Sequence, residues 1–485
     1  MTMTCPFHSV LNQALDLEGA GVGAEGAEVA PKKEFPFMPI GQAYDMGHAP
    51  DGTPLFDPRI LDSAEFARNP YPYYRILRDH YPVYFDKLHN TYWITRYEDI
   101  TRCYFDEEGF NTIPKGSSSG VLGNTQLELS GVEHRRRRNL YGRHLVGQAL
   151  EKRIYAIERL ADSMIESWLS DSPPPGVTRN ADGTLTIELG LAFANEFPIR
   201  VVCQVLGIPD DVKDKFFYWY YSMMTGLGGS ETAPNGIRAR QDLEDYVSSL
   251  VELRRREPGY LYDHAGKVVG KDIITQLCES VLDGDYLSTE EITSNIALIV
   301  GGGETTRGAI MNMWYLLLLH PEQFAAVSGD EALWDTAFHE TLRCASSIGG
   351  QPRHNTYDVE LHGVTIPAGS LCQMVDFSAN HDDRIFADPE AFDIFRSDLY
   401  SGKIIRSGHH DDGRHSHMAF GVGPHLCPGA WISHQEAVVG SKLLRRRLKK
   451  VSIHADKMPK DIDGVTLPPI GLGAIRELWL DIELA

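Results

Sequence analysis

A glycine-rich loop that holds one cysteine and runs directly into a helical stretch constrains this sequence most. Residues 417–436 read HMAFGVGPHLCPGAWISHQE, with Gly421, Gly423 and Gly429 around Cys427. Glycine permits backbone angles and close approaches that side chains forbid. We therefore expect peptide N–H groups to point at the Cys427 sulfur, and the helix start that follows to favour a thiolate.

The other six cysteines show no pattern of this kind. They stand at positions 5, 103, 203, 278, 344 and 372, and no two cysteines form a C-x-x-C pair. This spacing argues against zinc ribbons, thioredoxin-like chemistry and a disulfide framework. We interpret these six as small buried hydrophobic residues.

Composition and charge exclude several classes of protein. The 485 residues are 42% apolar, which is enough for a large core without disulfides, and the net charge is −21. A charge of this sign repels phosphate backbones and anionic lipid surfaces, so nucleic acid and membrane are poor partners. No apolar run reaches the length of a membrane span, and the first ten residues lack a signal-peptide pattern. We expect a cytoplasmic protein whose ligands are small molecules or proteins.

The amino-acid composition of the chain changes near residue 56. Residues 1–55 are rich in Gly, Ala and Glu and predict an extended N-terminal arm, and residues 56–485 predict the folded part. Residues 71–100 predict a helix followed by short strands, and residues 132–343 are mostly helical between glycine- and proline-rich breaks. Residues 358–374 alternate like strands around a turn. The expected fold is mainly α with a small β region (α+β).

A second unusual stretch has three glycines in the middle of a helical pattern. Gly301, Gly302 and Gly303 interrupt IALIVGGGETTRGAIMNMWY, and Glu304 and Thr305 follow at once. Each interior glycine costs about 1 kcal/mol relative to alanine. Close helix packing explains one or two glycines but not the adjacent acid and hydroxyl. Adjacent residues of a regular helix do not face one another, so Glu304 and Thr305 could act together only through water or through a local widening of the helix, which the glycines make cheap.

Together the two motifs resemble those of the cytochrome P-450 family. The family's cysteine signature, F-G-x-G-x-H-x-C-x-G, is matched at every fixed position, and its central-helix motif, A/G-G-x-D/E-T-T/S, is matched by GGGETT. The fixed residues of the cysteine signature are Phe420, Gly421, Gly423, His425, Cys427 and Gly429. The resemblance implies a triangular, haem-centred single domain that binds haem b with Cys427 as the axial ligand.

The resemblance also implies a reaction. An anionic sulfur on the iron pushes electron density that favours O–O cleavage. Thr305 and Glu304 would be the catalytic pair, Thr305 as a hydrogen-bonding hydroxyl and Glu304 as a proton relay from solvent. Pro428 has no N–H and so removes one donor to the sulfur. The expected enzyme is a monooxygenase that hydroxylates or O-dealkylates a substrate with dioxygen.

Two further residues resemble the family's structural pair. Glu340 and Arg343 are spaced three apart on one predicted helix face. We assign both to folding and haem retention. The family completes this pair with a basic residue in a later P-x-R-F segment, but residues 389–392 read PEAF. Arg396 is the candidate to replace the basic residue missing at Ala391.

Haem propionates need cationic or imidazole partners where they are partly buried. Family positions suggest His134 and Arg138 from H-x-x-x-R, Arg353 from QPRHN, and His417 from HMAFG. The cofactor-binding set thus comprises His134, Arg138, Arg353, His417, Phe420, Gly421, Cys427 and Gly429. Taken individually, each charged member of this set could also be an ordinary surface residue.

The resemblance implies only the general classes of redox partner and substrate. No flavin, nicotinamide or iron–sulfur motif is present, so electrons should come from a separate ferredoxin or flavodoxin with an NAD(P)H-dependent reductase. Residues 135–138 are four arginines that form either a docking spot for an acidic carrier or a solvated surface. The pocket should involve residues 117–122 and 347–350 and an aromatic run, and its candidate residues are Phe217, Ala297, Gly301 and Ile348. They suggest a small apolar or aromatic substrate.

Three alternatives remain at this point. A hydrogen peroxide-dependent haem-thiolate peroxygenase would not need the Glu304 and Thr305 pair. A non-catalytic haem protein that binds a gas or another ligand would explain the cysteine loop but not GGGETT. A structural or binding protein without haem would show no haem absorption.

Overall fold

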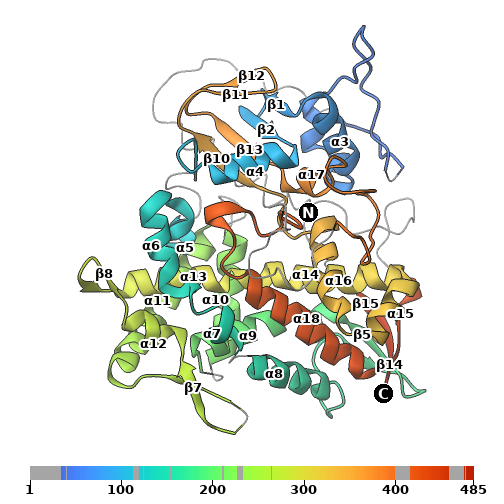
Figure 1. Cartoon of the computed structure of the whole chain (residues 1–485). Coiled ribbons are helices and arrows are strands. Elements are labelled where there is room, and N and C mark those ends of the chain that lie inside the picture. Colours follow the sequence, from blue (N-terminus) through green and yellow to red (C-terminus); the bar gives the residue numbers. More distant parts are fainter. Residues whose placement is uncertain are drawn as a thin grey trace.

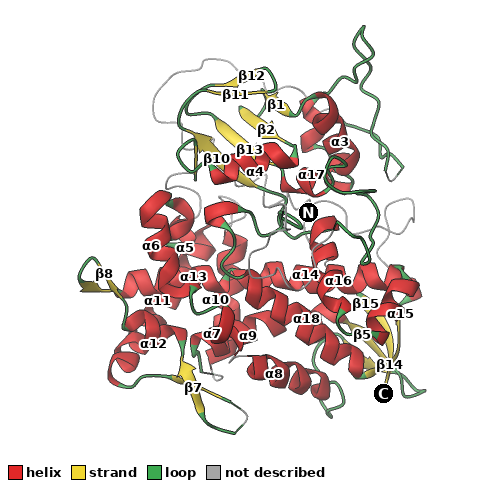
Figure 2. Cartoon of the chain, in the orientation of Figure 1, coloured by secondary structure: helices red, strands yellow, loops and turns green. Residues whose placement is uncertain are grey.

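The computed structural model describes residues 34–39, 41–112, 119–123, 125–151, 154–209, 212–226, 233–263, 265–398, 415–457, 475 and 477–485. The described elements group into a smaller part that contains a five-stranded sheet and a larger helical part (Figure 1). Helix predominates, and the strands are short (Figure 2). This agrees with the mainly α class with a small β region that the sequence predicts.

The five-stranded sheet has the order β1-β2-β13-β10-β3. Its β13 runs parallel to β2, and the other pairs are antiparallel. Aromatic and β-branched residues such as those of TYWI in β2 favour a pleated, half-buried surface. The strands are β1 (Val83–Asp86), β2 (Thr91–Ile94), β3 (Phe110–Asn111), β10 (Gln351–Asn355) and β13 (Leu371–Met374).

Short helices and one hairpin accompany this sheet. The helices are α2 (Ala64–Arg68), α3 (Tyr71–His80), α4 (Tyr97–Phe105) and α17 (Asp376–Asn380). Strands β11 (Val359–Leu361) and β12 (Val364–Ile366) pair around His362 and Gly363, which both have positive φ. Positive φ at both central residues is typical of a two-residue hairpin turn. The hairpin predicted within residues 358–374 is confirmed.

The helical part surrounds α14, which is buried on nearly all sides. A helix that is apolar all round belongs in the centre of a large core, and α14 packs against α9, α16 and α18. The helices are α5 (Ser119–Leu122), α6 (Gly131–Gly142), α7 (Gly147–Glu151), α8 (Ile154–Ser167), α9 (Phe197–Leu206), α10 (Lys213–Gly226), α11 (Ala233–Arg256), α12 (Ile273–Cys278), α13 (Thr289–Val300), α14 (Gly302–Leu319), α15 (Pro321–Gly329), α16 (Leu333–Cys344) and α18 (Ala430–Arg446).

Besides β3 and β10, eight of the described strands lie outside the segments for which the sequence predicts β structure. A four-stranded sheet of order β14-β15-β5-β4 joins the end of the chain to its middle, and two small hairpins interrupt the helical region. These strands are β4 (Val177–Arg179), β5 (Leu185–Glu188), β14 (Leu448–Ile453), β15 (Trp479–Leu484), β6 (Tyr260–Tyr262), β7 (Val268–Lys271), β8 (Val281–Leu282) and β9 (Asp285–Tyr286). Strands of two to six residues carry too little periodicity to predict.

The N-terminal arm is only partly covered, because residues 1–33 and 40 lie outside the described residues. Its described part contains no helix, but it does contact the body of the protein. Phe35 is buried in the core cluster that includes Tyr73 and Trp93, and the backbone N–H of Met38 donates to Glu65 at 3.1 Å. The predicted extended arm therefore contributes at least Phe35 to the buried core.

Among the described helices, none combines the length and the apolar character that crossing a bilayer requires.

Candidate active site

The cysteine loop folds back on itself just before α18. The Cys427 N–H donates to the Phe420 carbonyl at 2.8 Å, and Gly421 and Gly423 have φ values of +66° and +72°. A side chain in that left-handed region is strained, so these two positions favour glycine. The loop therefore needs its glycines for its path, as the sequence predicts.

The sulfur of Cys427 lies at the start of α18. Burial raises the pKa of the Cys427 thiol, while hydrogen bonds from the backbone of Gly429 and Ala430 and the nearby Arg138 guanidinium lower it. Peptide N–H groups aimed at sulfur favour the thiolate form and its use as a metal ligand. The predicted orientation of the peptide groups is present.

Helix α6 passes close to this loop. A Cβ at Gly142, its last residue, would lie 3.8 Å from the Pro428 ring. Pro428 has no N–H, so the peptide after Cys427 offers the sulfur no donor. This arrangement supports the hypothesis that Pro428 leaves the thiolate more electron-rich.

Pro428→Leu is therefore expected to raise the reduction potential of the haem iron. One added hydrogen bond of about 1 kcal/mol corresponds to roughly 40 mV for a one-electron couple. The measurement is a spectroelectrochemical titration of the haem protein. Pro428→Ala adds the same N–H with a smaller side chain, so the two variants should shift equally; potentials equal to the wild type in both would refute the idea.

The central helix is broken at the glycines. Helix α13 ends at Val300 and α14 begins at Gly302, with Gly301 between them. The hydroxyls of Thr305 and Thr306 both donate to the Gly302 carbonyl, at 3.0 and 3.1 Å. The Thr305 hydroxyl therefore lies next to an interruption of the central helix, a local distortion that the glycines make cheap.

Glu304 points away from Thr305. Its carboxylate pairs with Arg307, one turn further along α14, with an Oε1 to Nη2 distance of 2.5 Å. The Glu304 side chain is 42% exposed, whereas that of Arg307 is 12% exposed. Glu304 thus connects the break in the helix with solvent, but it cannot contact the Thr305 hydroxyl directly.

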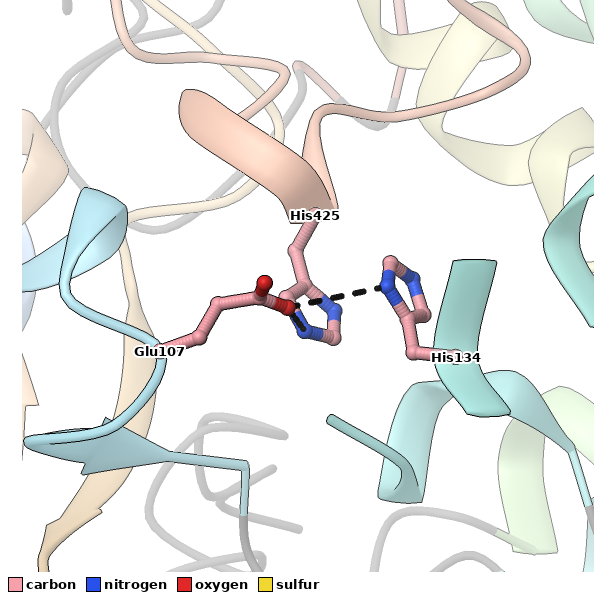
Figure 3. Close-up of side chains that lie close together, drawn as sticks. All are labelled: Glu107, His134 and His425. Atoms are coloured by element: carbon pink, nitrogen blue, oxygen red, sulfur yellow. Dashed lines mark ion pairs between the residues drawn. The ribbon is translucent and has the colours of Figure 1, made fainter. Parts of the chain in front are cut away.

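Three of the four residues predicted to bind propionates lie near one another. His134 from α6 stacks on His425 of the cysteine loop, with ring centroids 3.8 Å apart and 17° between the ring planes. Glu107 lies beside both rings (Figure 3), 3.9 Å from His134 Nδ1 and 3.6 Å from His425 Nε2. Arg138 and Arg353 add positive charge that lowers the pKa of both histidines.

This group of residues fits an anionic ligand. Burial first, and then the neighbouring cations, lower the pKa of His134 to about 4 and that of His425 to about 3. His134 Nδ1 and His425 Nε2 are buried with no hydrogen-bond partner among the described residues. Burial also lowers the pKa of the Arg138 and Arg353 guanidiniums. Carboxylate groups such as haem propionates would supply acceptors for these donors.

His417 does not belong to this group. Its Nε2 lies 3.0 Å from Nδ1 of His339 on α16, and its electrostatic neighbours are His339, His415 and Arg343. The residue that joins His134, Arg138 and Arg353 is His425. We therefore replace His417 by His425 in the set that we propose for the propionates; the signature motif had already marked His425.

The helix break is open at Gly302. Gly302 is exposed although it lies in the central helix, and a Cβ there would meet no atom within 4 Å. Thr306, one turn along, donates to Ser433 of α18 at 3.0 Å. The residues present fit haem: a cysteine with donors at its sulfur, an open glycine face, and buried cations and imidazoles for two propionates.

Comparisons with known proteins agree with this geometry. Residues 332–472 match the family model described as cytochrome P-450. The chain is 26% identical over 413 residues to a putative cytochrome P-450 123 of Mycobacterium tuberculosis, an alignment that covers 83% of this chain and 92% of that protein. It is 28% identical to the vitamin D(3) 25-hydroxylase of Pseudonocardia autotrophica, with 78% and 86% covered. The ligand-free structure of cytochrome P-450 TbtJ1 superposes with a TM-score of 0.68 at 25% identity, with 85% and 97% covered.

The chain belongs to the cytochrome P-450 family. It is accordingly an enzyme, a haem-thiolate monooxygenase of the bacterial type, and its cofactor is haem with a cysteine thiolate as the axial ligand. We propose Cys427 for that thiolate, because it is the cysteine of the signature motif.

The structural pair of this cytochrome P-450 is fully buried. Arg343 binds both carboxylate oxygens of Glu340, at 2.8 and 2.9 Å, and both side chains have 0% exposure. The Arg396 Nε lies 3.2 Å from Glu340 Oε1. Arg396 thus supplies the basic group that is missing at Ala391, whose carbonyl instead accepts a hydrogen bond from Arg343.

The predicted pocket residues lie along the broken helix of this cytochrome P-450 and next to it. Ala297 is fully buried, and a Cβ at Gly301 would lie 3.6 Å from the end of Met224 on α10. The segment containing Ile348 reaches α14 through Ser347, whose hydroxyl donates to the Thr305 carbonyl at 2.9 Å. Phe217, on the same helix as Met224, is partly buried in the main core. Residues 117 and 118 of the predicted pocket loop lie outside the described residues.

Sequence reasoning missed one aromatic residue here. Tyr220 on α10 is buried, and its hydroxyl lies 3.4 Å from the position of a Cβ at Gly303. Burial, and then the Glu304 charge, raise its pKa well above the ordinary value. The aromatic run around Phe217 was the available signal, but it does not show which ring faces the central helix.

Proposed function

We propose that this chain inserts one oxygen atom of dioxygen into a small apolar or aromatic substrate, by hydroxylation or O-dealkylation. The observation that carries the proposal is the glycine break at Gly301, which places the Thr305 hydroxyl on α14, the helix that is tied to α18 through Thr306 and Ser433. Haem, when bound, supplies the oxygen-activating chemistry.

Each side chain has a definite task in this proposal. Cys427 binds the iron, and His134, Arg138, Arg353 and His425 hold the propionates. Thr305 turns its hydroxyl from the Gly302 carbonyl toward the reacting oxygen, where its proton stabilises developing negative charge. Phe420, Gly421 and Gly429 remain in the proposed cofactor-binding set as parts of the cysteine loop.

Glu304 passes protons inward from solvent. Its exposed carboxylate is held by Arg307, and since it does not face Thr305, a water molecule must bridge the two. Glu340 and Arg343 take no part in the reaction in this proposal: with Arg396 they keep α16 in place for folding and haem retention.

The pocket residues support an apolar substrate of modest size. Phe217, Ala297, Gly301 and Ile348 are apolar, and Met224 adds a flexible side chain that adapts to shape. The relatives include a vitamin D(3) 25-hydroxylase and a nocardicin C N-oxygenase. Those names cover different chemical classes and do not select one substrate for this chain.

Electrons come, in our proposal, from a separate ferredoxin or flavodoxin and an NAD(P)H-dependent reductase in the cytoplasm. The arginines of α6 give little support to a docking spot there. Arg135 pairs with Glu107 at 2.8 Å, Arg136 pairs with Asp283, and Arg137 pairs with Glu133 at 2.6 Å. Acids of the chain itself neutralise these three arginines. We retain residues 56–485 as one haem-thiolate domain with residues 1–55 as its N-terminal arm.

Thr305→Ala tests the proposed chemistry. The variant is expected to retain haem and substrate binding, but to lower product formed per NAD(P)H by about 100-fold, because a positioned proton donor contributes roughly that much or more. The measurement is product, NAD(P)H and hydrogen peroxide in a reconstituted system with a surrogate reductase and ferredoxin. Substrates are first selected by spin-state titration of aromatic ethers, phenols, terpenoids and steroids.

Thr305→Ser retains the hydroxyl and serves as the matched control, with product close to the wild type. If the alanine variant formed as much product per NAD(P)H as the wild type, the proposed role of Thr305 would be excluded. Turnover that proceeds with hydrogen peroxide alone, and is not supported by reductase and dioxygen, would favour a peroxygenase.

A further inference from the structure

A second group of potential metal ligands lies between α16 and α18, away from the propionate-binding residues. Asp335 and His339 are four residues apart on α16 and share one face of that helix. His434 comes from α18, which packs against α16. One ligand atom from each of the three side chains lies within 4.8 Å of the others.

The contacts within this cluster are close and ordered. His434 Nε2 is 2.5 Å from Asp335 Oδ1, and the rings of His339 and His434 are stacked at 5.7 Å with 27° between their planes. The Nδ1 atom of His339 lies 3.0 Å from His417 Nε2. The second ring nitrogen of His339 is therefore oriented by a neighbouring group, as is usual for histidines that bind metals.

The surroundings allow an ion to reach the cluster. His339, His417 and His434 line a cavity whose other walls include Phe420 and Trp431. Both His339 and His434 are largely buried, with 8% and 7% exposure. Burial also lowers the pKa of His339 to about 3, so its ring is neutral and able to coordinate at neutral pH.

Two imidazoles and one carboxylate, with water in the fourth position, are a donor set that zinc accepts in tetrahedral geometry. Ligand atoms about 2.0–2.2 Å from one zinc ion lie roughly 3.4 Å apart in that geometry. The Asp335 to His434 contact would have to open by about 1 Å, which rotation of the carboxylate can supply. An ion bound between the two side chains would take the place of their direct contact.

We propose that Asp335, His339 and His434 form a zinc site that clamps α16 to α18 beside the cysteine loop. It is separate from the cluster of Glu107, His134 and His425, whose imidazoles are taken by the propionates in the holoenzyme. Zinc at this site holds together the two helices that carry Glu340 and the residues after Cys427, so it stabilises the folded holoenzyme.

The test uses the haem-loaded protein after dialysis against a chelator. Equilibrium dialysis with zinc chloride and elemental analysis should show one tight zinc per haem, and saturation should raise Tm. Asp335→Asn and His434→Gln keep the size and hydrogen-bonding capacity of the pair, and each is expected to weaken zinc binding by at least about 100-fold. The reduced, carbon monoxide-treated spectrum of each variant shows that the haem domain is folded.

A histidine pair that precedes His415 in the sequence provides the control. His409 and His410, which lie outside the described residues, precede His415 in the sequence GHHDDGRH, and alanine at both positions should leave the tight zinc in place. Loss of that zinc in the double variant, its retention in both cluster variants, or no tight zinc in the wild type would each overturn the proposal. X-ray absorption of the zinc-loaded wild type should show scattering from two imidazoles, and a spectrum without imidazole scattering would overturn it independently of any variant.

Discussion

Replacement of Cys427 by serine is expected to abolish the red-shifted Soret band of the reduced, carbon monoxide-treated protein and to reduce turnover below detection. The band reports a thiolate on the iron, and in this family the thiolate supplies the electron density that favours O–O cleavage. The serine hydroxyl stays protonated at neutral pH and is a poor ligand. The measurements are the difference spectrum, the haem to protein ratio and reductase-supported product formation.

Cys203→Ala is the matched control. Cys203 is buried in α9 and belongs to the main core, so its replacement by alanine removes a buried sulfur without touching the cysteine loop. A normal thiolate spectrum is expected, with a modest loss of stability. A thiolate-type spectrum that survives in Cys427→Ser would show that another residue binds the iron, and the assignment of the site would be lost with it.

Glu340→Gln is expected to have the largest effect on folding. The variant removes one charge from a buried group and leaves the Arg343 and Arg396 guanidiniums without their shared carboxylate. Loss of one partner of a buried ion pair costs about 3–5 kcal/mol, against a total stability of roughly 5–15 kcal/mol for a folded domain. We expect little haem-loaded protein, with a lower Tm and reduced haem content in whatever is recovered.

The same substitution on α6 shows how much burial matters. Glu133→Gln breaks the pairs with Arg136 and Arg137, but the Glu133 side chain is 39% exposed. Solvent screens such pairs, so the expected cost is about 0–1 kcal/mol. Equal losses of Tm in the two variants would contradict the structural role of Glu340.

Local patterns in the sequence were sufficient for several features. The glycine loop around Cys427, the break at Gly301 and the hairpin at His362 and Gly363 each depend on backbone freedom within a few residues. Such features are encoded where they occur, because left-handed φ values and helix breaks are properties of single residues and their neighbours. The signature motifs then indicated haem-thiolate chemistry.

Features that depend on distant segments needed the folded chain. The pairing of β5 with β15 joins residues almost 300 positions apart. Neither strand is long enough for its alternation of apolar and polar residues to predict that pairing. His417 and His425 both flank the cysteine loop, and only the path of the loop shows that His425 meets His134 while His417 meets His339. Glu107, which pairs with Arg135, and Asp283, which pairs with Arg136, both come from outside α6.

The sequence by itself therefore indicated Cys427 as the iron ligand that we propose, the interruption of the central helix and the helix-rich class, since each depends on residue types at short spacing. The folded structure was needed to show that Arg396 replaces the base absent at Ala391, that His425 lies with the cationic groups, and that Asp335, His339 and His434 converge. Those facts depend on which helices pack together, and packing is settled by the burial of side chains from the whole chain rather than by any local pattern.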